Sequence, residues 1–178
     1  MLSSYKEAAE RGNAEAQNIL GWHYIEGDEV EQSYEKAIYW FTSAAEQGNA
    51  MAQYGLGWCY AFGNGVEQSY EKAVEWYTKA AEQGNAKAQN NLGECYKKGQ
   101  GVEQSYEKAV EWFAKAAEQG NVNAQFILGA CYEGGDGVEQ SYPIAMYWYQ
   151  QAMRQDDEEA EARYINLYQR GYRASKNS

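Results

Sequence analysis

The sequence predicts an all-α fold, a right-handed α-solenoid built from tandem pairs of antiparallel helices. Three observations lead to this prediction: an internal repeat of 36 residues, helical spacing of apolar residues within each copy, and a single proline in 178 residues. Fixed repeat periods of about 20 to 50 residues are typical of solenoids, and helical periodicity excludes their β forms. One copy cannot bury a core alone, so we expect the copies to stack on their neighbours.

The repeat is visible when the chain is laid over itself at a period of 36 residues. The segment VEQSYEK begins at Val30, Val66 and Val102, and its shorter form VEQSY begins at Val138. A glycine, a leucine and a tryptophan recur with the same period, at Gly12, Gly48, Gly84 and Gly120, at Leu20, Leu56, Leu92 and Leu128, and at Trp40, Trp76, Trp112 and Trp148. The chain is predicted to be one solenoid domain, divided into a half repeat at 1–12, repeats at 13–48, 49–84, 85–120 and 121–156, a capping helix at 157–171 and a tail at 172–178.

Each copy is predicted to form two helices, which we name helix A and helix B. In the second copy, helix A is expected over residues 50–62 and helix B over residues 70–83. Asn49 and Ser69 precede these helices, and their side chains can accept a hydrogen bond from a backbone N–H group of the first turn. Gly84 can adopt the left-handed conformation that ends helix B.

The ends of the repeat array depart from this pattern. Glu29 occupies the loop position that holds a glycine in the other copies, so that turn is the least regular. After the fourth copy, Asp156 replaces a loop glycine, and acidic residues follow it in the first turn of the predicted closing helix. Negative charge suits the N-terminal end of a helix dipole. This helix is expected to seal the core with Ala160, Tyr164 and Leu167.

The charge of the chain opposes nucleic-acid and membrane partners. Lysine and arginine total 15 against 26 aspartate and glutamate, which gives a formal net charge of -11. Such a chain is repelled by nucleic-acid phosphates and by anionic membrane surfaces. No apolar run is long enough to span a bilayer, and the N-terminal residues do not resemble a secretion signal. We therefore expect a soluble, cytoplasmic protein.

The motif AxAQxxLGxxYxxGxGV, followed by KAxxWxxKAAxQG, resembles the Sel-one-like repeat, a longer relative of the tetratricopeptide repeat. The resemblance covers residues 13–155. It implies an α-solenoid and an adaptor role, since proteins of that family generally bring partners together. Helix B of the family usually opens with aspartate, and here a serine that caps comparably takes its place, at Ser33, Ser69, Ser105 and Ser141.

The candidate site comes from the positions at which the nearly identical copies differ. Helix B barely varies, whereas helix A varies at its second, fifth, ninth, twelfth and thirteenth residues. These offsets share one helix face, away from the face that packs on helix B. By resemblance to tetratricopeptide repeats, they line the concave groove in which partner peptides lie. The predicted partner-binding residues are Trp22, Glu26, Met51, Tyr54, Trp58, Phe62, Lys87, Asn90, Glu94, Lys97, Lys98 and Phe126.

We predict that a protein or peptide binds this groove, with its aromatic residues as anchors. Lys87, Lys97 and Lys98 are expected to pair with acidic side chains or with a C-terminal carboxylate. A solvated face can also vary neutrally, but neutral drift does not readily place large aromatic residues in water. The alternative function is a self-assembling structural subunit, in which the ligand is another copy of the chain.

We predict neither enzymatic activity nor a metal or other cofactor. The segment SYEK matches the Ser-x-x-Lys motif of penicillin-binding enzymes, but it recurs where a helix cap is needed, and the companion motifs are absent. His23 aligns with Cys59, Cys95 and Cys131. Ligands spaced one per repeat cannot converge within about 2.0–2.3 Å of one zinc ion. The thiols are expected to be small, reduced, buried packing residues.

Overall fold

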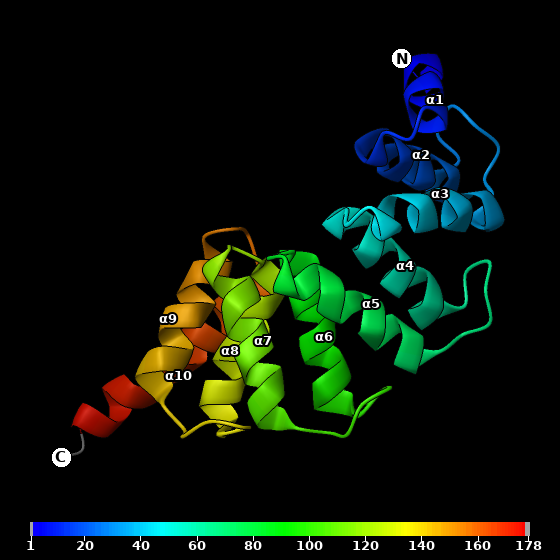
Figure 1. The fold of residues 1–178 in the computed structure, drawn as a ribbon. Helices are drawn as coiled ribbons and strands as arrows, with labels where there is room; N and C mark the ends of the chain where they lie inside the picture. Colours follow the sequence, from blue (N-terminus) through cyan, green and yellow to red (C-terminus); the bar gives the residue numbers. More distant parts are fainter. Residues whose placement is uncertain (1, 177–178) are drawn as a thin grey trace.

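The computed structural model describes residues 2–176 and places side chains through Gly171. Within this range every regular element is a helix, and the helices follow one another along a curved path from α1 to α10 (Figure 1). They are α1 (Leu2–Glu10), α2 (Ala14–Glu26), α3 (Tyr34–Glu46), α4 (Ala50–Phe62), α5 (Tyr70–Glu82), α6 (Ala86–Lys98), α7 (Tyr106–Glu118), α8 (Val122–Gly134), α9 (Tyr142–Met153) and α10 (Glu158–Lys176). The predicted all-α solenoid of helix pairs is confirmed.

The helices alternate in role along the chain. Helices A are α2, α4, α6 and α8, and helices B are α3, α5, α7 and α9. Each helix A packs on the helix B of its own copy and on the helix before it in the chain. In addition, α2 touches α4, and α4 touches α6. Helices A thus lie side by side from α2 to α6, and we call the side of the array that helices A form the inner side.

The helix ends lie where local sequence chemistry predicts them. The Asn49 side chain accepts from the Ala52 N–H at 2.9 Å, and Ser69 Oγ accepts from the Lys72 N–H at 3.3 Å. Gly84 has a φ of 87°, the left-handed conformation expected after helix B. The serines of the SYEK segments, Ser33, Ser69 and Ser105, are thus helix caps, as predicted. The prediction is wrong for Ser141, whose side chain makes no capping bond at the start of α9, where Pro143 stands in the first turn.

The closing helix α10 differs from the prediction in its length. Asp157 caps its start, where Oδ1 accepts from the Ala160 N–H at 2.8 Å. Asp156, which replaces a loop glycine, still adopts the left-handed conformation with a φ of 64°. Each helix A ends at a left-handed glycine, such as Gly135 with a φ of 82°, whereas Gly171 lies within α10. The helix therefore continues past the predicted end at residue 171 to Lys176.

Each helix B fills the core with one large ring that meets a glycine of its own helix A. The rings are Phe41, Tyr77, Phe113 and Tyr149, all fully or almost fully buried. A Cβ atom added to Gly57 would lie 2.5 Å from the Tyr77 ring, and one added to Gly93 would lie 2.7 Å from the Phe113 ring. The glycine that follows the repeated leucine is therefore explained by packing, because helix A and helix B approach each other there too closely for a side chain.

A buried glutamine joins each helix A to the helix before it and to the glutamine that follows its own helix B. Gln89 of α6 donates from Nε2 to the carbonyl oxygen of Ala81 in α5 at 3.0 Å. Its Oε1 accepts from Nε2 of Gln119, which follows α7, at 2.7 Å. The same pair of bonds is made by the aligned residues Gln17, Gln53 and Gln125. This glutamine clamp connects consecutive repeats through polar contacts inside the core.

Replacing Gln89 by leucine is expected to lower the free energy of unfolding by about 2 kcal/mol, because the buried bond to Ala81 and the part-buried bond with Gln119 are both lost. Urea denaturation of the full chain, followed by circular dichroism, measures the change. Gln151→Leu on α9 is the matched control, since its only side-chain bond among the described residues is to exposed Arg154. A loss for Gln89→Leu no larger than that of the control would refute the clamp.

Candidate partner-binding groove

The aromatic residues predicted for the groove contact one another across α2 and α4. The Trp22 ring is stacked on Tyr54 with centroids 6.0 Å apart, and it lies 6.4 Å from the Trp58 ring. The Trp58 and Phe62 centroids are 5.5 Å apart. We call Trp22, Tyr54, Trp58 and Phe62 the aromatic row. The structure thus brings together four residues that the sequence separates by up to 40 positions.

The aromatic row is less exposed than the sequence suggested. Phe62 is 63% exposed, but Trp22, Tyr54 and Trp58 are only half-buried rather than open to water. Trp22 meets the buried Phe41 ring edge-on at 5.1 Å, and Tyr54 lies 6.0 Å from the Tyr77 ring. The prediction that these rings are exposed to water is therefore correct for Phe62 and wrong for the other three. These rings belong partly to the core and present only part of their surface to the inner side.

The other uncharged residues predicted for the groove differ in their exposure. Met51 is exposed, at 37%. Phe126 of α8 is half-buried and lies 5.7 Å from the Tyr149 ring. Asn90 is only 8% exposed, so it presents little surface to a partner, and its Oδ1 has no hydrogen-bond partner among the described residues.

The charged residues predicted for the groove differ in their surroundings. Glu26 and Lys87 are exposed. Lys98 Nζ lies 2.7 Å from Glu94 Oε2, and Lys97 Nζ lies 3.7 Å from Glu94 Oε1. The hydrogen bond that the Lys98 ammonium group donates to the Glu94 carboxylate raises the pKa of Lys98. Both lysines therefore have an acidic partner within the chain, which the sequence prediction did not include.

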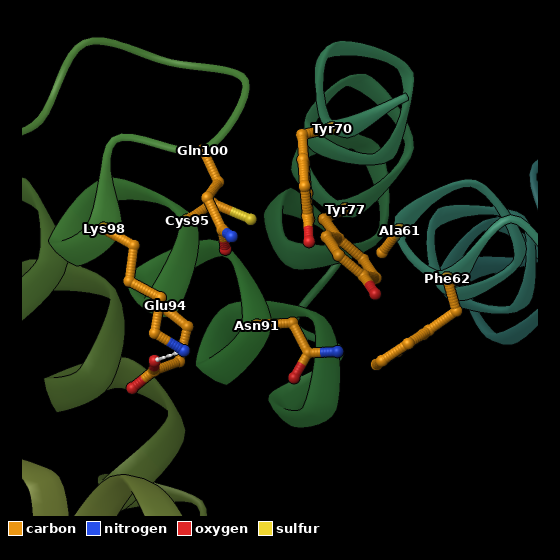
Figure 2. A pocket seen from close by; sticks show the side chains of 9 residues that line it. All are labelled: Ala61, Phe62, Tyr70, Tyr77, Asn91, Glu94, Cys95, Lys98 and Gln100. Atoms are coloured by element: carbon orange, nitrogen blue, oxygen red, sulfur yellow. Dashed lines mark ion pairs between the residues drawn. The ribbon is translucent and has the colours of Figure 1, made fainter. Parts of the chain in front are cut away.

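A pocket of about 290 Å³ lies beside Phe62, between α4, α5 and α6 (Figure 2). It contains three residues of the predicted site, Phe62, Glu94 and Lys98. Figure 2 shows Phe62 and Tyr77 near Asn91, with the Glu94–Lys98 ion pair on α6 farther along the pocket. The complete lining is Ala61, Phe62, Tyr70, Tyr77, Asn91, Glu94, Cys95, Lys98 and Gln100.

Sequence reasoning missed Asn91 and the Tyr77 hydroxyl as parts of this pocket. Burial raises the pKa of the Tyr54 and Tyr77 hydroxyls, and a side-chain hydrogen bond with Asn91 opposes the rise in both. The sequence did contain an indication of Asn91, because the sixth residue of helix A also varies among the copies. Its four occupants are Ile19, Gly55, Asn91 and Ile127. The hydroxyl varies too, because the residues aligned with Tyr77 are Phe41, Phe113 and Tyr149.

The cysteines are buried packing residues, as predicted. Burial raises the pKa of Cys59 to about 12 and that of Cys95 and Cys131 to about 11. His23 Nδ1 lies 3.0 Å from the carbonyl oxygen of Asp28. In the part of the chain that the structure describes, no three His, Cys, Asp or Glu side chains are grouped as metal ligands. The same residues include no helix long and apolar enough to cross a membrane.

Solved structures similar to this chain are Sel1 repeat proteins. A protective antigen of uropathogenic Escherichia coli, c5321, displays an SLR fold and is 42% identical, with a TM-score of 0.92, over 96% of this chain and 37% of its own. A Sel1 repeat protein from Oxalobacter formigenes is 37% identical, with a TM-score of 0.83, over 90% of this chain and 64% of its own. This chain therefore spans less than two thirds of either protein.

Helicobacter pylori cysteine rich protein B shares the fold at 23% identity, with a TM-score of 0.58, over 72% of this chain and 92% of its own. A comparison with curated proteins finds no matching sequence. The Sel1 repeat pattern matches four consecutive segments, residues 14–49, 50–85, 86–121 and 122–157. Since these segments cover most of the sequence, the chain belongs to the Sel1 repeat family.

Proposed function

We propose that this protein is an interaction scaffold that holds a peptide or protein segment on its inner side. Sel1 repeat proteins generally mediate protein–protein interactions, and the family is generally non-enzymatic. The observation that carries the proposal is the aromatic row, which ends at the exposed Phe62 ring and the pocket beside it. Aromatic side chains supported by a packed core are typical anchors of protein interfaces.

The distribution of sequence variation among the copies also supports the inner side as the binding surface. Helices α5 and α7 differ at only two of their 13 residues, so the outer helices of these repeats are nearly interchangeable. On the inner side, the ninth residue of helix A changes from Trp22 and Trp58 to Glu94 and then to Ala130. The thirteenth residue changes from an acidic to an aromatic, a basic and a small residue along the array. A partner whose side chains complement these changes along the array would bind in only one orientation.

The double substitution Trp58→Ala and Phe62→Ala is expected to weaken partner binding at least about tenfold, because it removes two anchors of the aromatic row. Affinity capture from the native lysate, followed by titration of the recovered partner, measures the loss. The matched control is Tyr39→Ala with Tyr147→Ala, which removes exposed aromatic residues from helices B.

The control variant is expected to bind like the unmodified protein, and both variants should keep their helical circular dichroism. Equal recovery of every partner by the unmodified protein and the Trp58→Ala, Phe62→Ala variant would overturn the proposed function. An equal loss in the control would place the binding surface elsewhere.

A further inference from the structure

We infer that the pocket beside Phe62 selects a peptide that carries a large apolar side chain together with a nearby carboxylate. The apolar side chain would lie against Phe62 and Tyr77, and the carboxylate would bind Lys98 in the pocket and the neighbouring Lys97, which lies outside the pocket lining. This inference rests on the proposed function, because it specifies the class of peptide that the inner side holds.

The apolar part of the pocket suits a single side chain. Phe62 is 63% exposed, and Ala61, Tyr70 and Cys95 line the same space. A volume of about 290 Å³ lies just below the usual range of ligand pockets, which starts near about 300 Å³. Covering the Phe62 ring would remove apolar surface from water, which favours a leucine-sized or phenylalanine-sized group.

The charged cluster that borders the pocket has more positive than negative charge. Glu94 and Lys98 line the pocket, whereas Lys97 lies outside its lining. Lys97 and Lys98 share the single carboxylate of Glu94, at 3.7 and 2.7 Å. The lysine side chains remain 39% and 55% exposed, so a ligand can reach them. A second carboxylate would balance the cluster, whereas a basic group would be repelled by the excess ammonium. Because Glu94 already orders both lysines, an incoming carboxylate loses less free energy to side-chain ordering.

Asn91 lies between the apolar and charged parts of the pocket and can hold the peptide unit that links them. Its side-chain amide has both donors and an acceptor, as a peptide N–H and C=O require. The Nδ2 of the buried Asn90 donates to Asn91 Oδ1 at 3.4 Å. The Asn91 side chain also lowers the pKa of the Tyr54 and Tyr77 hydroxyls, against the larger opposite effect of their burial. These neighbours orient the amide before a ligand arrives.

Synthetic peptides of defined composition test the inference. Each fluorescently labelled peptide has a glycine-serine background with one central leucine and one glutamate placed one, two or three residues after it. Matched peptides replace the glutamate by glutamine or the leucine by alanine, and every peptide is made as a C-terminal acid and as an amide. Fluorescence anisotropy should show that leucine with a carboxylate binds about tenfold tighter than either matched peptide. Tight binding of the glutamate amide would assign the carboxylate to a side chain, and tight binding of the glutamine acid would assign it to the C-terminus.

The double substitution Lys97→Gln and Lys98→Gln is expected to weaken the carboxylate peptides about tenfold and to leave the uncharged peptides unchanged. Lys108→Gln on α7, where the ammonium group lies over the Tyr96 ring, is the control for loss of positive charge outside the pocket. It is expected to have little effect.

Two results would overturn the inference. One is equal binding of glutamate, glutamine, acid and amide peptides, which leaves the proposed function intact if Phe62→Ala still weakens them. The other is no binding of any leucine peptide to the unmodified protein. In that case, partner capture that depends on Trp58 and Phe62 would still support the proposed function.

Discussion

Replacing Phe113 by alanine is expected to lower the free energy of unfolding by about 3–5 kcal/mol, the range for removing a large ring from a packed core. Phe113 is fully buried in α7 and lies against Gly93 of α6, which has no side chain to fill the space that the ring would leave. Urea denaturation of the full chain, followed by circular dichroism, measures the loss.

The matched control for this prediction is Phe62→Ala, the same substitution at a ring that is 63% exposed. Its free energy of unfolding is expected to change by no more than about 0.5 kcal/mol, as is usual at the protein surface. Equal losses for the two variants would show that Phe113 is not the packing element we describe. The control also establishes that Phe62→Ala acts on binding rather than on folding.

Replacing Gly101 by alanine is expected to cost about 3 kcal/mol of unfolding free energy. Gly101 has a φ of 71°, and the left-handed conformation costs a residue with a side chain about 1–2 kcal/mol. An added Cβ would also lie 2.3 Å from the carbonyl carbon and oxygen of Tyr70, at the start of α5. The loop would have to move away from that helix, which adds about 1–3 kcal/mol.

Gly84→Ala separates the cost of the left-handed conformation from the cost of the close contact. Gly84 has a φ of 87°, but nothing lies within 4 Å of the position of an added Cβ. Its unfolding free energy should therefore fall by only about 1 kcal/mol. Equal losses for the two variants in urea denaturation would contradict the close contact between loop and helix.

In the first copy, Glu29 keeps the left-handed conformation, with a φ of 56°, and its side chain is exposed.

The helices could be predicted closely from the sequence because their determinants are local and repeat. Helix A of the second copy was predicted over residues 50–62 and is found at Ala50–Phe62. Asn49 and the left-handed Gly63 fix its two ends. Capping depends on a few adjacent residues, so one correct assignment applies to every copy.

The depth of the aromatic residues could not be predicted in the same way. The α4 helix carries apolar residues on most sides, so their spacing does not separate the core face from the inner side. Whether Tyr54 is open to water depends on Trp22 and Tyr77, which belong to other helices. The Asn91 pocket and the Gln89 clamp likewise depend on contacts between helices rather than on a local pattern.

The location of the partner is tested most directly by photo-crosslinking from single positions. Benzoylphenylalanine is introduced either in place of Phe62, on the inner side, or in place of Glu111, an exposed residue of the outer helix α7. After irradiation in the native lysate, we expect a partner crosslinked from position 62 and none from position 111. A partner crosslinked from position 111 and not from position 62 would contradict it.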